Sequence, residues 1–174
     1  HDKKGVIAAL DIGGKVDATV LTIQNKNGDV IFQHGWVRDW SQLLPTIMEH
    51  LKQYGSPACY VETNGVGETP YTQLKWDYPM AKEWRTTAKS KAAIVEKLVY
   101  DFNTGYISIP RNEVLLDELA CFEMKEQSGQ YRKYGHPSGK HDDRVMSLAI
   151  CNYNRAKIQT VQPMVINTSR QRSI

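Results

Sequence analysis

Three strand-like segments precede the first helical pattern of this chain, and that order limits the folds it can adopt. Residues 6–10 form a short continuous apolar run, which is typical of a central strand covered on both faces. Residues 17–24 are rich in β-branched residues, a turn signal follows at 25–29, and residues 30–36 resemble a third strand. The first part of the chain is therefore predicted to be an antiparallel meander.

Helical and strand-like patterns alternate after this meander. Apolar residues recur at helical spacing from Leu43 to Leu51, with Asp39 or Ser41 as the cap. The remaining elements are expected in the order strand 58–62, a helix ending near 76, strand 81–86, a helix after Thr87, a helix after Asn112, a hairpin within 122–134, and a helix from about 142 to 158. This order predicts an α/β fold: a mixed five-stranded sheet, with three antiparallel strands then parallel strands, flanked by helices and carrying a small extra hairpin.

The length and composition fit one compact domain. A chain of 174 residues with 41% hydrophobic and 24% charged residues is ordinary for a globular protein with a sizeable core. We expect the domain to span residues 1–158, followed by a polar tail at 159–174 that has little reason to fold alone. The net charge of +3 permits a polyanionic partner but is far below that of a protein that coats nucleic acid.

The cysteines argue against a disulfide framework and against a zinc site. Cys59, Cys121 and Cys151 are an odd number, each lies in an apolar run, and none has a Cys-x-x-Cys spacing. They are predicted to be small core residues in a reducing compartment. The sequence has no apolar stretch of the roughly 18 residues that a membrane helix needs, and its start lacks a secretory pattern. We therefore expect a soluble intracellular protein with no membrane partner.

Acidic residues stand where three of the predicted elements begin or end. Asp11 ends the first apolar run, Glu62 ends another, and Asp142 and Asp143 open the last helical pattern. Because the fourth predicted strand can lie parallel beside the first, Asp11 and Glu62 would emerge at the same edge of the sheet. Carboxylates that meet there are poorly solvated and need a counter-charge, which a divalent cation usually supplies.

Oxygen ligands favour Mg²⁺ or Mn²⁺ over zinc. Phosphodiester hydrolysis in a two-metal site needs acidic ligands that hold two divalent ions roughly 3.5–4 Å apart. The sequence therefore predicts a metal-dependent enzyme that cuts phosphodiesters. The residues predicted to be both catalytic and metal-binding are Asp11, Glu62, Asp142 and Asp143.

Each of these acids also has a structural interpretation. Asp11 can be a turn residue before two glycines, Glu62 can be a surface carboxylate, and the Asp142–Asp143 pair can be a helix cap. At about 100° per residue, a helix that is regular from its first residue directs Asp142 toward the sheet and Asp143 toward the border of the apolar stripe. Asp17 is a further acidic candidate, although a surface position at the start of a strand fits it better.

Several blocks of the sequence together resemble one protein family. They are Ala-Leu-Asp11-Ile-Gly with Asp17 after it, Tyr-Val-Glu62, residues 86–91, residues 105–110, Asp117-Glu118-Leu119 before Phe122, and His141-Asp142-Asp143-Arg-Val-Met-Ser-Leu-Ala, which is the most specific. The chain resembles the nuclease domain of the large terminase of tailed bacteriophages, the DNA-packaging motor subunit.

The resemblance implies a fold like that of ribonuclease H and Holliday-junction resolvases. It also implies Mg²⁺- or Mn²⁺-dependent cutting of double-stranded DNA at the start and end of packaging. The metal ligands it implies are Asp11, Glu62 and one or both of Asp142 and Asp143. Many relatives have aspartate at the position of Glu62, but the longer side chain still reaches a metal.

The resemblance further implies partners and a location. A full terminase carries an ATPase, yet no Gly-x-x-x-x-Gly-Lys-[Ser/Thr] motif occurs here, since His141 follows Gly139-Lys140. The chain begins at His1 and not at Met, which indicates either a longer parent chain or a removed tag. We expect a separate ATPase domain, the portal and the small terminase subunit as partners, in the cytoplasm of the infected bacterial host.

Double-stranded DNA would be held mainly through its phosphates. Packaging cuts need little base information, and scattered basic side chains suit contacts to the DNA backbone. Each such residue can instead be a solvated surface residue, and His141 an ordinary loop histidine. The residues predicted to contact DNA are Arg85, Lys89, Lys91, Arg132, Lys133, Lys140 and His141.

Other functions fit parts of the same pattern. The block around Asp11 also resembles the first phosphate-binding strand of sugar kinases and actin-like ATPases, but those proteins are longer and have a second phosphate loop. Within the nuclease class, a Holliday-junction resolvase or a transposase-like enzyme is an alternative. The last alternative is a non-catalytic module that binds DNA or docks on a motor.

Overall fold

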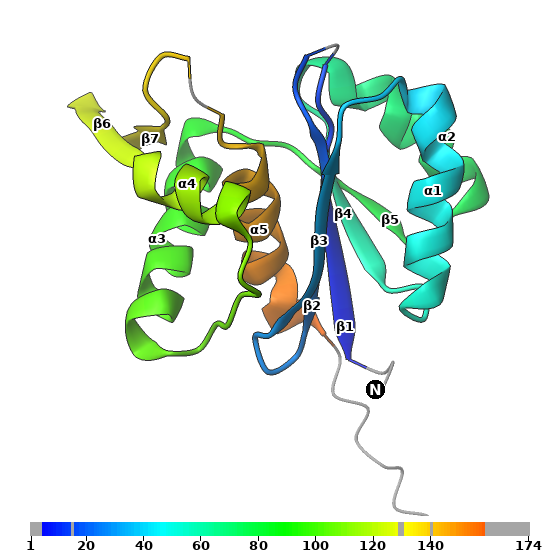
Figure 1. Cartoon of the computed structure of the whole chain (residues 1–174), viewed down its shortest axis with the longest axis horizontal. Coiled ribbons are helices and arrows are strands. Elements are labelled where there is room, and N and C mark those ends of the chain that lie inside the picture. Colours follow the sequence, from blue (N-terminus) through cyan, green and yellow to red (C-terminus); the bar gives the residue numbers. More distant parts are fainter. Residues whose placement is uncertain (1–4, 15, 129–130, 140, 159–174) are drawn as a thin grey trace, which may run out of the picture.

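A five-stranded mixed sheet forms the centre of the molecule (Figure 1). The computed structural model describes residues 5–14, 16–128, 131–139 and 141–158. The strand order is β3-β2-β1-β4-β5; β1, β2 and β3 are antiparallel neighbours, and β4 and β5 add in parallel beside β1. The strands are β1 (Val6–Asp11), β2 (Thr19–Asn25), β3 (Val30–Trp36), β4 (Ala58–Glu62) and β5 (Ala81–Trp84). The predicted meander and mixed sheet are confirmed.

Helices cover both faces of this sheet (Figure 1). On one face lie α1 (Trp40–Gln53) and α2 (Glu68–Asp77), with a 3₁₀ turn, η1 (Gly65–Gly67), before α2. On the other face lie α3 (Ala88–Thr104), α4 (Glu113–Cys121) and α5 (Asp143–Asn154). The predicted small hairpin is present as β6 (Glu123–Ser128) and β7 (Tyr131–Gly135), and β7 packs on α3.

The central strand β1 contributes to two hydrophobic cores. Ile7 and Ala9 face the core under α3 and α5, whereas Ala8 and Leu10 face the core under α1 and α2. Alternate side chains of a strand point to opposite faces, so an unbroken apolar run is what a strand covered on both sides requires. No helix in the described part of the chain is long and apolar enough to cross a membrane.

Local capping signals are found where the sequence predicts them. The Thr87 side chain accepts from the Ser90 amide, and the Ser90 side chain accepts in turn from the Thr87 amide, which closes a capping box at the start of α3. Gly105 ends α3 with a φ of 72°, a left-handed conformation that favours glycine. The Asn112 side chain caps α4 by accepting from the amides of Val114 and Leu115.

The last helix is shorter than predicted. It ends at Asn154 and continues as a 3₁₀ turn, η2 (Arg155–Lys157). The amide side chain of Asn154 donates to the Ile150 carbonyl, and the backbone N–H of Arg155 donates to the carbonyl of Asn152, three residues back. Such side-chain competition and tighter pairing typically mark a helix end. The predicted polar tail at 159–174 lies outside the described residues.

Buried polar side chains fix α5 against β2. The hydroxyl oxygens of Thr22 and Ser147 lie 2.8 Å apart, and Ser147 also donates to the Val20 carbonyl at 3.1 Å. Further along α5, Gln24 donates to the side chain of Asn152 at 3.3 Å. Because buried polar groups are costly unless they are paired, these bonds favour one register of helix against sheet. That register sets the position of the first turn of α5.

Candidate metal centre

Asp11 and Glu62 lie at the carboxyl ends of neighbouring parallel strands. In the register of β1 and β4, Leu10 is paired with Val61, and Asp11 and Glu62 are the next residue along each strand. The two carboxyl groups therefore emerge at the same edge of the sheet, as expected from the predicted strand order.

The pKa of Asp11 reflects its burial and the acidic groups around it. Its pKa is raised well above the usual value, first by burial and then by the negative charges of Glu62 and Asp143. A hydrogen bond with the Glu62 side chain and the charge of Asp142 act in the same direction. The other three carboxyl groups named from the sequence are thus close enough to Asp11 for their charges to act on it, which is a situation that a bound cation relieves.

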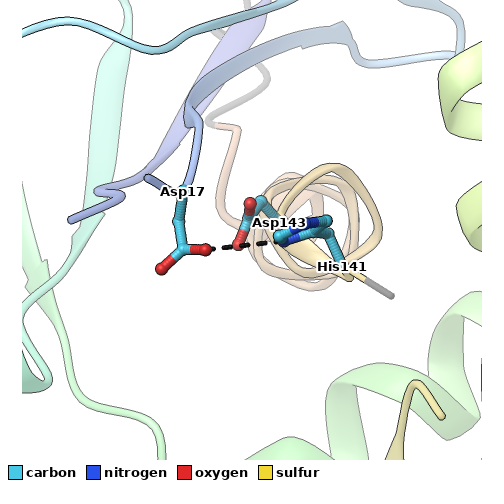
Figure 2. A group of neighbouring side chains, drawn as sticks. All are labelled: Asp17, His141 and Asp143. Carbon is cyan, nitrogen blue, oxygen red and sulfur yellow. Dashed lines mark ion pairs between the residues drawn. The ribbon is translucent and has the colours of Figure 1, made fainter. Parts of the chain in front are cut away.

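A second group of ligand atoms lies beside Asp143 (Figure 2). Asp17, His141 and Asp143 each offer one ligand atom, and these atoms all lie within 4.8 Å of one another. His141 Nδ1 is 3.4 Å from Asp17 Oδ1. Burial raises the pKa of Asp143, and the charge of Asp17 adds to this effect. One carboxylate and one imidazole thus join the acids at the start of α5.

The two aspartates at the start of α5 point in different directions. Asp143 begins the helix and accepts a hydrogen bond from the Ala18 amide, in the loop between β1 and β2, at 3.3 Å. Asp142 precedes the helix with φ −133° and ψ 13°, and its side chain makes no capping bond to the described first turn. It instead lies near Lys91 Nζ, at 3.4 Å, and His136 Nε2, at 3.7 Å.

This differs from the helical projection, which directed Asp142 toward the sheet. The projection assumed a helix that is regular from Asp142 onward, whereas α5 begins one residue later. The backbone of Asp142 is not helical, so the projection of about 100° per residue does not apply to its side chain. The alternative in which the Asp142 side chain serves as an ordinary helix cap does not describe this structure.

Two glycines allow tight turns around the acids. A Cβ on Gly13 would collide with the carbonyl oxygen of Asp17, and a Cβ on Gly67 would collide with the carbonyl oxygen of Glu62. The Gly13 amide also donates to Thr19 Oγ1 at 3.1 Å, which closes the loop that carries Asp17. The absence of a side chain at these two positions lets the backbone return closely over the ends of β1 and β4.

Solved structures share this architecture, although no family model and no curated protein match the sequence. The large terminase nuclease from thermophilic phage G20c with bound magnesium matches with a TM-score of 0.79 at 20% identity, over 88% of this chain and 82% of that chain. The large terminase nuclease domain of Thermus phage P74-26 matches with a TM-score of 0.75 at 18% identity, over 88% and 81%. This chain has the fold of a large terminase nuclease domain.

A terminase nuclease domain from a different virus has a similar fold. A variant of the nuclease domain of the large terminase subunit gp2 of bacterial virus Sf6, solved with manganese and beta-thujaplicinol, has a TM-score of 0.74 at 13% identity. The match covers 87% of this chain and 89% of that chain. The terminase nuclease fold therefore accounts for most of the chain, and the predicted ribonuclease H-like architecture is confirmed.

The predicted DNA-contacting residues are distributed over several elements of this terminase nuclease fold. Lys91 is paired with Asp142, and Arg85 is paired with Glu83 at 3.1 Å on the surface. Lys89 is exposed in the first turn of α3, and His141 faces Asp17. The exposed pair on β7 is Arg132 and Lys133. Lys140 lies outside the described residues.

Three residues near this centre have only weak signals in the sequence. The sequence pattern favours a position for Asp17 at the start of a strand. In the structure β2 begins only at Thr19, so Asp17 lies in the loop that follows the glycine turn. His136 follows the hairpin with no motif around it, so no local signal marked it. Glu118 is marked in the sequence only by the block that resembles the terminase family, although its carboxylate contacts the first turn of α5.

Proposed function

We propose that this chain is a divalent-metal-dependent endonuclease that cuts double-stranded DNA during viral genome packaging, by two-metal phosphodiester hydrolysis. The observation that carries the proposal is that Asp11 and Glu62 end neighbouring parallel strands, and that Asp142 and Asp143 at the start of α5 lie near enough to act on Asp11. Such a cluster is unfavourable without a cation, and acids from distant parts of the chain have no structural need to converge. The shared fold of the phage terminase nucleases supports the same activity.

Mg²⁺ or Mn²⁺ fits the donor set at this centre. Carboxylate oxygens dominate it, and oxygen ligands are what these ions prefer. The proposed ligands are Asp11, Glu62, Asp142 and Asp143, and the arrangement in Figure 2 adds Asp17 and His141 as groups within reach. When bound, such ions activate water and stabilise the charge on the leaving oxygen. Magnesium and manganese in the G20c and Sf6 structures support this choice.

The chain's own residues would hold the DNA and keep the acids in place. Lys89, Arg132 and Lys133 are exposed cations that suit phosphate contact, and we propose the same role for Arg85, Lys140 and His141. The glycine turns at Gly13 and Gly67 keep the acid-bearing loops tight. As part of this proposal, the chain acts with an ATPase domain, the portal and the small terminase subunit in the cytoplasm of the infected host.

The direct test is nicking of a supercoiled plasmid in the presence of Mn²⁺ or Mg²⁺. We expect cleavage by the wild-type chain, loss on addition of EDTA, and loss in Asp11→Ala. Asp77→Ala is the matched control, because Asp77 is an exposed acid at the end of α2. Cleavage that persists in Asp11→Ala would overturn the proposal. A strong preference for cruciform over linear DNA would indicate a junction resolvase instead.

A further inference from the structure

The first turn of α5 is capped from another helix. The backbone amides of Arg144 and Val145 both donate to Glu118 Oε2 on α4, at 2.8 and 3.2 Å. Arg144 and Val145 are the second and third residues of α5. The amides at these two positions are the ones that the side chain of an N-cap residue normally binds. The N-cap residue here is Asp142, and it leaves both amides to Glu118.

The consequence for Asp142 is that its carboxylate is available for other contacts. An aspartate in this position ordinarily folds back onto the helix, since Asp is among the best N-cap residues. With the amides already bonded, the two oxygens of Asp142 face Lys91 Nζ at 3.4 Å and His136 Nε2 at 3.7 Å. Asp143, next in the chain, is held by the Ala18 amide at 3.3 Å.

Glu118 is itself held firmly. Its side chain is 11% exposed, and Arg144 Nε lies 3.9 Å from Glu118 Oε1. The helix that carries it is capped by Asn112 and anchored by the fully buried Leu115. On the other side of α5, Gln33 donates to the Arg144 carbonyl at 3.1 Å. The first turn of α5 is thus fixed between α4 and the sheet.

We propose that Glu118 is a positioning residue for metal binding: it caps α5 in place of Asp142, and so leaves the Asp142 carboxylate free to bind a cation. This inference rests on the proposed function, because it assumes that the acidic cluster binds divalent ions. Glu118 does not itself touch the ion; it acts through the backbone of Arg144 and Val145. Supporting groups of this kind typically change metal affinity 10- to 100-fold when they are removed.

Mn²⁺ binding to the DNA-free protein, measured by electron paramagnetic resonance, tests this without any turnover. Glu118→Gln keeps an oxygen that can accept from the amides, so we expect Mn²⁺ affinity within about threefold of wild type. Glu118→Ala releases both amides, Asp142 turns back to cap them, and affinity falls by about 10- to 100-fold. Glu118→Asp keeps the charge but is one methylene shorter, so affinity falls by about tenfold even though the fold is retained.

The matched control is Glu113→Ala, which removes an exposed glutamate on the same helix. We expect Glu113→Ala to leave Mn²⁺ affinity unchanged. A second readout is the NMR signal of the Arg144 and Val145 amides, which shifts in Glu118→Ala and returns toward its wild-type position in Glu118→Gln.

Three results would separate the possibilities. Equal loss in Glu118→Gln and Glu118→Ala would make the charge the determinant and overturn positioning. Reduced thermal stability with unchanged Mn²⁺ affinity in Glu118→Ala and Glu118→Asp would leave only a structural cap and also overturn it. A wild-type chain that binds no Mn²⁺ would overturn the proposed function and this inference together. If the wild-type chain binds Mn²⁺ and Asp11→Ala does not, the acidic cluster is the binding site, and the Glu118 variants then test the positioning role alone.

Discussion

Lys91 Nζ on α3 lies 3.4 Å from Asp142 Oδ2 at the start of α5. The side chains are 28% and 17% exposed, so the pair is only partly screened by water. Lys91 Nζ also lies 6.0 Å from the centre of the Phe122 ring, a contact that helps to hold it there. A residue predicted to contact phosphate thus has a carboxylate of the acidic cluster as its partner in the structure.

A fixed cation beside Asp142, a proposed metal ligand, opposes the binding of a second cation. We expect Lys91→Met to tighten Mn²⁺ binding by about two- to fivefold, the equivalent of about 0.4–1 kcal/mol for a partly exposed pair. Isothermal titration of the DNA-free protein measures the change. Lys89→Met is the control, since Lys89 is an exposed lysine two residues away. Weaker binding in Lys91→Met would mean that Lys91 orients Asp142 for the metal instead of competing with it.

The acidic cluster should cost stability when no metal is bound. Burial and the neighbouring charges raise the pKa of Asp11, so its stabilising contribution is present in acid and is lost as pH rises through the folded-state pKa. We therefore expect Asp11→Asn to abolish cleavage and to raise the Tm of the metal-free chain at neutral pH. The difference disappears below about pH 3, where Asp11 is protonated in both folded and unfolded states.

Calorimetry in EDTA between pH 3 and pH 8 measures this effect. A rise of about 2–4 °C corresponds to roughly 1 kcal/mol in a domain of this size. Asp77→Asn, on the exposed end of α2, should leave the Tm unchanged at every pH. A lower Tm for Asp11→Asn at neutral pH would contradict mutual repulsion in the cluster.

Adjacent glycines in the β1–β2 loop offer a sharp contrast. A methyl group on Gly13 collides with the Asp17 carbonyl, whereas one on Gly14 meets only Asp17 Oδ2, at 3.9 Å. We expect Gly13→Ala to move the loop, to destabilise the fold by about 1–3 kcal/mol, and to reduce cleavage. Gly14→Ala should keep both stability and cleavage close to wild type. Urea unfolding and plasmid nicking of the two variants, side by side, check this, and equal behaviour would contradict it.

DNA binding through phosphates should depend strongly on salt. In the Asp11→Ala chain, which we expect not to cleave DNA, the logarithm of the association constant is expected to fall linearly with the logarithm of salt concentration. Replacing Arg132 and Lys133 on β7 with alanine should reduce that slope by about 0.9 for each phosphate that is no longer neutralised. Fluorescence anisotropy measures it. Arg111→Ala is the control, because this exposed arginine is paired with Glu113 at 2.9 Å. An association constant that does not change with salt concentration would contradict recognition through the DNA phosphates.

The sheet, and the positions of most of the acidic residues at its edge, could be predicted from the sequence because they follow from local patterns. An apolar run, β-branched segments and turn residues are enough to order the strands, and a parallel β4 must bring Glu62 level with Asp11. Capping signals at Thr87 and Asn112 are equally local, and both are confirmed.

Relationships across the fold could not be predicted in this way. The direction of Asp142 depends on whether the helix begins at residue 142 or 143, and one residue is beyond the accuracy of any pattern. The capping of α5 by Glu118 joins residues 26 positions apart, and the Lys91–Asp142 pair joins residues 51 apart. Such contacts follow from the packing of helices, which periodicity does not encode.

The strand that carries Asp11 is hydrogen-bonded on both edges and buried on both faces. The amides of its buried residues, from Ile7 to Leu10, are therefore expected to exchange with solvent deuterium only when the whole domain opens, and Asp11 directly follows them. Partial unfolding of the hairpin or of an outer helix would leave this strand intact. The strand that presents Asp11 should consequently be among the last features to disappear as the protein denatures.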